Sequence, residues 1–339
     1  MTALDHFAPH YPTRQSPHYE VWYGKVDLPD ERALWFRYTT LNGVIKEAAT
    51  WAIFFSPDGI QTGKTRWWLE ELLPTGPLSP RDEPESPLGP TTRFARRHAA
   101  FRVADAHLDD GNALGSAGSI SWDLFWENRG LSFSYIPHGL HQAGLAKSTY
   151  DDCFMDLRVS GVIQAGSERV EFENARGMLG HIQGSQIAGA DWAWAHCNHC
   201  DDHPDAVFEG LSARALLPGG RKSPLLTAMV LFLDGQRYSF HGPLQILNHQ
   251  SDFDRHRWNF LATQGDLQLY GEARAPAQVA LVRYTDTDGS HLFCFNSKLA
   301  TLSLKLIDPK RPEPVHLTST GRSAFEVVTR DRPDLPLDL

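Results

Sequence analysis

The sequence contains few cysteines and no concentrated positive charge. It has four cysteines in 339 residues, too few for a disulfide framework, and this usage fits a reducing compartment. The formal net charge is -9, and no run of lysine or arginine supplies the basic footprint that nucleic acid or an anionic membrane surface requires. The composition therefore argues against nucleic acid as a partner.

Long apolar runs and helical periodicity are also missing. No apolar run approaches the roughly 20 residues that span a bilayer. Residues 1–10 lack the basic start and apolar stretch of a signal peptide. We therefore predict a cytoplasmic protein without membrane insertion. The near absence of amphipathic helical patterns excludes a helical bundle.

The dominant pattern consists of short runs of β-branched and aromatic residues, separated by Gly, Pro, Asn and Asp. This pattern is typical of strands and turns. Asp-Gly pairs at 234–235 and 288–289 predict tight hairpins, because glycine accepts the positive φ that such turns need. We expect strands throughout, for example at 206–217, 225–233 and 244–248, and a surface loop in the proline-rich stretch 74–90. Many short antiparallel strands predict an all-β barrel or sandwich.

A glycine-rich stretch at residues 177–189 separates two series of predicted strands. The chain is long enough for two domains, so we predict domains at 1–180 and 181–339. His181 and Gln183 lie between glycines, and we expect flexible backbone there to bring both side chains close to a ligand. The alternative is a glycine-rich crossover loop without a functional role.

The segment from Asp191 to His203 is rich in chemically useful side chains. Strand alternation places Trp192, Trp194 and His196 on one face and Asp191 on the other. Two tryptophans followed by a histidine would line an apolar cavity with one proton donor at its end. The alternative is that both tryptophans belong to the core and that His196 is a hydrogen-bonded buried histidine.

Cys197-Asn-His-Cys200 is a CxxC pair surrounded by histidines and aspartates, so zinc and redox chemistry must be weighed. A structural zinc site normally recruits a second ligand pair, and the sequence contains no second CxxC or HxxxH. A thioredoxin-like pair would sit in a βαβ context, which is also missing. We therefore expect no metal at this site and no cofactor in the protein. The alternative is a metal-dependent enzyme that uses the cluster His196, Cys197, His199, Cys200 and His203.

Asp123 and Trp122 alternate on a predicted strand, Ile120 to Trp126, so one of the two side chains faces the interior. A carboxyl group buried among aromatic rings would have a raised pKa and could serve as an acid near neutrality. The alternative is that Asp123 faces solvent, which is the commoner arrangement for an aspartate on a strand.

Two of these motifs carry a resemblance to a known family. Gly180-His-Ile-Gln-Gly184 closing the first half, and Trp192-Ala-Trp194 opening the second, are similar to motifs of the hydroxyneurosporene synthase (carotenoid 1,2-hydratase) and AttH-like family. Tocopherol cyclases and kievitone hydratases look like more distant relatives. The resemblance implies two lipocalin-like β domains and a pocket for a lipophilic molecule. Gln183 stands where the family usually has tryptophan, which argues against a carotenoid substrate.

We accordingly expect an all-β protein of two lipocalin-like antiparallel β-barrel domains, with a hydrophobic, isoprenoid- or polyketide-like small molecule as its partner. The expected activity is a cofactor-independent hydratase or cyclase that protonates an alkene. Its catalytic candidates are Asp123, His181, Asp191 and His196, and its ligand-binding candidates are Trp122, Gln183, Trp192 and Trp194. Asp191 and His196 reach one pocket only if a bulge intervenes. The alternative is a non-catalytic lipocalin-like carrier.

Overall fold

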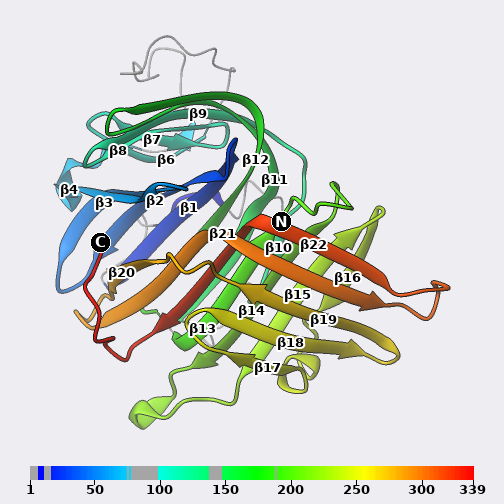
Figure 1. The fold of residues 1–339 in the computed structure, drawn as a ribbon. Coiled ribbons are helices and arrows are strands. Elements are labelled where there is room, and N and C mark those ends of the chain that lie inside the picture. The colour runs from blue at the N-terminus through cyan, green and yellow to red at the C-terminus, as the bar shows by residue number, and fades with distance from the viewer. Residues whose placement is uncertain (1–6, 11–16, 75, 78–97, 137–146, 188) are drawn as a thin grey trace. The chain divides into compact units, whose positions relative to one another are not determined.

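A computed structural model describes residues 7–10, 17–74, 76–77, 98–136, 147–187 and 189–339. Its contacts divide the chain into two compact units. The first unit comprises Met1–Ile187, Thr285–Ser290 and Leu339, and the second comprises Ala188–Tyr284 and His291–Asp338. Each unit is built around one antiparallel β-sheet (Figure 1), and the all-β prediction is confirmed.

The sheet of the first unit has the strand order β4-β3-β2-β1-β12-β11-β9-β8-β7-β6-β5, with β10 paired to β11. A one-turn 3-10 helix, η2 (Leu69–Glu71), follows β4. The strands are β1 (His18–Leu28), β2 (Arg32–Asn42), β3 (Lys46–Ser56), β4 (Gly59–Trp68), β5 (Gly76–Pro77), β6 (His98–Val103), β7 (Ala106–Asp109), β8 (Asn112–Ala117), β9 (Ile120–Asn128), β10 (Phe133–Ser134), β11 (Ser148–Ala165) and β12 (Glu168–Gly184).

The sheet of the second unit has the order β16-β15-β14-β13-β22-β21-β19-β18-β17, with β20 paired to β21. Two 3-10 turns, η3 (Pro218–Gly220) and η4 (Gln245–Leu247), lie between strands. The strands are β13 (Gly189–Cys197), β14 (Val207–Ala215), β15 (Leu226–Leu233), β16 (Gln236–Phe240), β17 (Gln250–Phe253), β18 (Arg257–Gln264), β19 (Leu267–Arg274), β20 (Ala280–Thr285), β21 (His291–Ile307) and β22 (Val315–Thr329).

The two sheets share one topology and each curls on itself. In both, the first strand pairs with the last, and the last two strands form a long hairpin, β11–β12 or β21–β22. In the first unit the far strands meet where Thr50 Oγ1 donates to the Ser116 carbonyl at 2.5 Å. In the second, the Ser212 and Ser251 hydroxyls lie 2.7 Å apart. Closure of this kind leaves few exposed edges.

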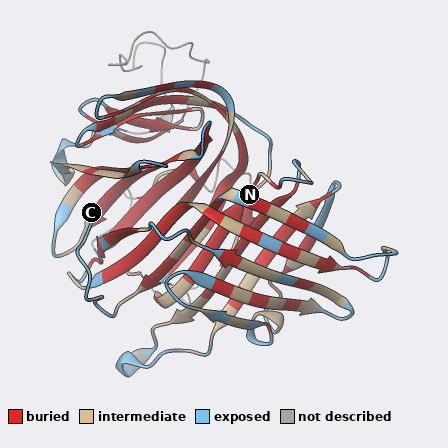
Figure 2. Ribbon diagram, viewed as in Figure 1, coloured by how far each residue is buried: buried red, intermediate tan, exposed pale blue. Residues whose placement is uncertain are grey.

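Apolar side chains fill the inside of each sheet, but burial extends further than this core. Strands β1, β2 and β3 are buried almost without interruption, whereas β18 and β19 show more exposed positions (Figure 2). When an antiparallel sheet has one face in water, buried and exposed residues alternate along each strand. Polar side chains on the second face of such buried strands are therefore withdrawn from solvent, and the cluster around His196 lies at positions of this kind.

Residues from the second half of the sequence complete the first unit. The Val44 N–H donates to the Thr287 carbonyl at 2.9 Å, and the Thr287 hydroxyl donates to the Ser185 carbonyl at 2.8 Å. The Asp286 carboxylate also accepts the Ile187 N–H at 3.0 Å. The segment Thr285–Ser290, which runs from the end of β20 toward β21, is thus tied to the turn between β2 and β3 and to the residues that follow β12.

The observed strands and turns test several of the local predictions. Both Asp-Gly pairs form turns, with Asp234-Gly235 joining β15 to β16. The predicted strand at 244–248 is wrong, because η4 occupies that segment. Most of the stretch 74–90 lies outside the described residues. The predicted boundary between residues 180 and 181 falls inside β12, and the first unit continues to Ile187.

The glycine-rich stretch is also not the flexible loop expected from its composition. Gly177, Gly180 and Gly184 lie in β12 and Gly189 begins β13, and at these positions neighbouring groups need the space of a missing Cβ. A Cβ on Gly180 would come within 2.3 Å of the Tyr23 ring, and one on Gly177 within 2.6 Å of Val159. Close packing, not backbone mobility, explains the glycines. No helix in the described residues is long and apolar enough to cross a membrane.

Candidate functional site

A buried cluster forms around His196 on the second unit's sheet. His196 lies on β13 directly opposite Glu209 on β14, and its Nδ1 is 2.7 Å from a Glu209 carboxylate oxygen. The other oxygen of Glu209 accepts the indole N–H of Trp194. The rings of Trp194 and His196 stack at 6.4 Å with an interplanar angle of 14°. Both side chains of the His196–Glu209 pair are fully buried.

The predicted alternation along this strand is confirmed. Ala193, Ala195 and Cys197 belong to the apolar core of the second unit. Trp194 and His196 therefore project from the opposite face of the sheet, because successive strand residues point to opposite sides. That face is buried as well, so the polar groups on it are held in a dry environment where their electrostatic interactions are strong.

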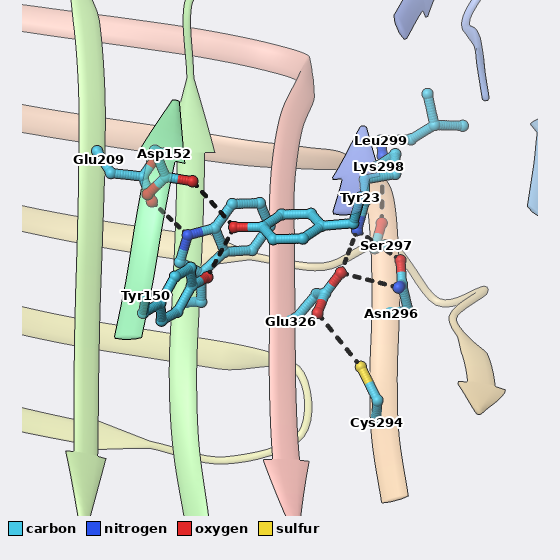
Figure 3. Close-up of polar contacts among 11 residues, drawn as sticks. Tyr23, Tyr150, Asp152, Glu209, Cys294, Asn296, Ser297, Lys298, Leu299 and Glu326 are labelled. Atoms are coloured by element: carbon cyan, nitrogen blue, oxygen red, sulfur yellow. Dashed lines mark hydrogen bonds and ion pairs between the residues drawn. The ribbon is translucent and has the colours of Figure 1, made fainter. Parts of the chain in front are cut away.

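A second group of charged side chains lies on the same face of the second unit's sheet, next to Trp194. Glu326 on β22 is directly opposite Trp194, and Asn296 on β21 is directly opposite Glu326. The Lys298 ammonium donates to Glu326 at 2.7 Å and to the Asn296 side chain at 2.6 Å (Figure 3). It also lies 5.6 Å from the centroid of a Trp194 ring, a cation–π distance.

Cys294 completes this group. Its thiol donates to Glu326 at 3.5 Å (Figure 3). Burial, and then the negative charge of Glu326, raise the pKa of this thiol well above its usual value. The thiol therefore stays protonated, and it acts here as a hydrogen-bond donor to the carboxylate, not as a nucleophile. The Glu326 carboxylate consequently receives hydrogen bonds from Cys294, Asn296 and Lys298.

His181 forms a similar arrangement in the first unit, on the core-facing side of the sheet. Its Nε2 lies 2.9 Å from Glu20, and its ring stacks on Trp22 at 4.7 Å and 5°. The His10 N–H donates to the same carboxylate at 2.8 Å. The indole N–H of Trp22 donates to the Phe7 carbonyl at 3.0 Å. The N-terminal segment thus closes over this histidine, which is fully buried.

Three predicted site residues lie apart from these two histidines: Trp122, Asp123 and Asp191. Trp122 is in the core of the first unit, where its indole donates to Tyr38 at 2.9 Å, and Asp123 is buried on the opposite face of β9. Asp191 pairs with Arg214 and Lys222 at 3.3 and 3.1 Å near the surface. Its carboxylate thus does not join the His196 cluster.

The predicted ligand-binding residues Trp192 and Gln183 differ in burial. Trp192 is half-buried and packs beside Gly189, where a Cβ would come within 2.6 Å of the indole. Gln183 is buried, and its amide donates to the Thr149 hydroxyl at 3.1 Å. Gln183 shares β12 with His181, two residues away on the same face.

The cysteine pair of the CxxC motif is reduced, buried and separated by 3.8 Å between the sulfur atoms. A hydrogen bond with Cys197 and burial raise the pKa of the Cys200 thiol far above its usual value, so this thiol is protonated. His199 turns away to contact Arg322 at 2.9 Å. Among the described residues, no group of three or more His, Cys, Asp or Glu side chains is arranged to hold a metal ion.

Three buried carboxylates were not predicted from the sequence: Glu20 beside His181, Glu209 beside His196, and Glu326 beside Trp194. Glu209 and Glu326 each interrupt an otherwise apolar strand, as in Val207-Phe208-Glu209 and Phe325-Glu326-Val327. A single charged residue in such a run is costly to bury unless it is paired. That pattern was the available signal, but naming the partner requires the register between strands.

Comparison with solved structures supports the fold. The chain resembles CghA with Sch210972 (TM-score 0.59, 11% identity, covering 97% of this chain and 93% of that one). It also resembles a protein from Nitrosomonas europaea described as an AttH (0.54, 11%, 96% and 95%). Kievitone hydratase from Nectria haematococca is a third neighbour (0.53, 8%, 98% and 94%). No family model matches the sequence, and no curated protein matches it.

These neighbours cover nearly the whole chain, so the resemblance to AttH-like proteins and hydratases is confirmed at the level of the fold. At 8–11% identity, the likeness concerns the backbone architecture alone. A shared fold leaves function to be argued from the chemistry of the site.

Proposed function

We propose that the protein is a hydratase or cyclase that acts by acid catalysis on a hydrophobic small molecule, with His196 as the acid. The observation that carries this proposal is the fully buried His196–Glu209 pair stacked beside Trp194. Structural neighbours described as a kievitone hydratase and as CghA with a bound small molecule are consistent with this chemistry.

The geometry gives each residue a role. Glu209 faces Nδ1 of His196, which fixes the tautomer and compensates the positive charge that the ring carries when it is protonated. The proton would then leave from Nε2. The N–H bond breaks, a C–H bond forms at one alkene carbon, and the neighbouring carbon becomes a cation. The π-face of Trp194 is adjacent to His196 and attracts such a charge.

The second step decides between the two reactions. In a hydratase, water adds to the cation and a proton returns to His196. In a cyclase, a second double bond of the same molecule attacks the cation and closes a ring, which leaves a new cation. The neighbouring carbon then loses a proton to His196, and a new alkene forms. Glu326 is bound by Lys298 and Asn296 on the far side of Trp194, so the ammonium compensates its charge, and Trp194 and Glu209 are the groups that favour either cation.

A lipophilic carrier would need an apolar lining and no such cluster. Burying two carboxylates, a lysine and a histidine on one face is costly, and clusters of this kind occur preferentially at functional sites. This observation favours the enzyme over the carrier. We further propose a reducing, cytoplasmic location, in which the four cysteines remain the free thiols seen here.

The test is a mass-spectrometric screen of prenylated phenols, linear polyenes and unsaturated polyketides. Hydration adds the mass of water, and cyclisation leaves the mass unchanged but shifts the retention time. In D₂O, the product gains one deuterium on carbon. We expect His196→Gln and Glu209→Gln to lower turnover by about 10²–10⁴-fold, whereas His249→Gln, at a buried histidine elsewhere in the same unit, leaves it unchanged.

Two outcomes would contradict the proposal. Ligand binding without turnover of any bound compound would favour the carrier. If turnover persists in both His196→Gln and Glu209→Gln, another residue is the acid. Native mass spectrometry of untagged protein, followed by organic extraction, identifies the compounds with which the screen should begin.

A further inference from the structure

A chain of three polar side chains crosses the first unit's sheet. Tyr23 on β1 donates its phenolic hydrogen to Asp152 on β11 at 2.9 Å, and its oxygen lies 3.1 Å from the Tyr150 hydroxyl (Figure 3). Asp152 is fully buried and Tyr23 is nearly so, whereas Tyr150 is only half-buried. The chain therefore runs from a buried carboxylate to a more accessible phenol.

Two backbone features make this chain possible. Tyr23 and Asp152 are on strands that do not pair with each other, because β12 lies between β1 and β11. Tyr23 crosses β12 above its register partner Gly180, where a Cβ would come within 2.3 Å of the phenolic oxygen. The glycine in the middle of a long strand thus gives the phenol its path.

The second feature is a β-bulge in β11. Asp151 pairs with His181 and Phe154 pairs with Leu179, so Asp152 and Cys153 together oppose Gly180. A bulge re-aims side chains and is found preferentially next to functional sites. Here it aims Asp152 at the tyrosine that passes over Gly180. Glycine and bulge occur at the same point of the sheet, and each is needed for the same contact.

The hydrogens in the chain set its direction. Tyr23 has one phenolic hydrogen, and its hydroxyl is the donor toward both the Asp152 carboxylate and the Tyr150 oxygen, so Tyr150 stands in this chain as an acceptor. A phenolic oxygen can also accept hydrogen bonds through its lone pairs, and donation toward a buried carboxylate strengthens that ability. The accessible end of the chain is therefore a hydrogen-bond acceptor.

Aromatic rings lie beside this acceptor. The Tyr135 ring is 4.8 Å from the Tyr150 ring at 45°, and the Phe133 ring is 4.8 Å from that of Tyr135. A planar group next to Tyr150 would have aromatic neighbours with which to pack. A flat molecule with an acidic hydroxyl fits both the acceptor and the rings.

We propose that Tyr150, oriented by Tyr23 and Asp152, is a ligand-binding residue of the first unit that recognises the acidic hydroxyl of a planar phenolic or enolic group. The hydroxyl hydrogen of the ligand is donated to the Tyr150 oxygen, and no proton transfer is required. This site does not depend on acid catalysis by His196 and is tested by binding alone.

The experiment compares two probes, 4-nitrophenol and its methyl ether 4-nitroanisole, in equilibrium dialysis below pH 6, where the phenol is protonated. The probes share a flat ring, but the ether lacks the hydrogen that Tyr150 would accept. A single hydrogen bond between neutral groups changes affinity by up to about tenfold. We therefore expect the native protein to bind the phenol about tenfold more tightly than the ether.

Tyr150→Phe, which keeps the ring, is expected to reduce this ratio to about one. Tyr270→Phe, the same change at a partly exposed tyrosine of the second unit, is expected to leave it unchanged. Asp152→Asn is expected to lower the ratio without abolishing binding of the ether. Equal affinities for the two probes in the native protein, no binding of either probe, or a ratio that survives Tyr150→Phe would each overturn the proposal.

Discussion

Removing the Glu209 carboxylate is expected to destabilise the second unit strongly, and the size of the effect follows from its contacts. One carboxylate oxygen accepts the Trp194 indole N–H and the other faces His196 Nδ1 at 2.7 Å. In Glu209→Leu both donors lose their acceptor inside a dry site. Breaking one side of such a buried pair typically costs about 3–5 kcal/mol, so we expect a loss of that order in the free energy of unfolding.

Glu209→Gln is the informative comparison. The amide oxygen can still accept from Trp194, and the amide NH₂ can donate to Nδ1 if His196 moves its hydrogen to Nε2. The expected loss is then only about 1 kcal/mol, with a change of tautomer as the signature. Urea denaturation followed by tryptophan fluorescence measures the stability, and ¹⁵N NMR of the histidine ring reports the tautomer.

A double variant separates this explanation from simple loss of packing. In His196→Leu/Glu209→Leu both members of the pair are apolar, so the unpaired buried donor at His196 is absent. Replacing both partners of a buried polar pair is often far less harmful than replacing one. We expect the double variant to be more stable than Glu209→Leu by at least about 1 kcal/mol. If the two single losses simply add, the reasoning is refuted.

Three further predictions concern other parts of the chain. Gly180→Ala places a methyl group within 2.3 Å of the Tyr23 phenol, so it should destabilise the first unit in urea denaturation by about 1–3 kcal/mol; an unchanged midpoint would contradict the packing. Burial lowers the pKa of Lys64 from 10.5 to about 8, against the opposing effect of Glu47. Between these values the unfolded chain holds a proton that the folded protein has lost, so stability should rise with pH in this window. Lys64→Met should lack that slope, and an identical pH profile in both proteins would refute it. The four thiols are buried, so a thiol reagent such as DTNB should react slowly with the native protein and fully in guanidinium; rapid native labelling would contradict the burial.

The fold class and one strand of the site could be predicted from the sequence because both depend on local pattern. Strand alternation has a period of two, so the common face of Trp194 and His196 follows from their spacing. The partner Glu209 does not, since it meets His196 only through the register between β13 and β14. No local pattern specifies that register.

The glycine-rich stretch was interpreted wrongly, as a flexible boundary between domains. Glycines at 177, 180 and 184 are typical of a loop, and the sequence therefore indicated a domain boundary where β12 runs through the centre of a sheet. The reason for each glycine is a side chain or backbone group on another strand, such as Tyr23. Those contacts join residues far apart along the chain, so composition alone could not distinguish tight packing from flexibility.

The pairing of first and last strands has a consequence for how the protein is made. On the ribosome, β1 emerges first and must wait for β12 before its sheet can close. The segment Thr285–Ser290, which completes the first unit, is translated about 100 residues later still. At roughly 5–20 residues per second, β1 waits at least several seconds for β12, and the edge of β1 that pairs with β12 stays open during that time. Such edges invite pairing with other chains, so chaperone access during synthesis should limit the yield of folded protein.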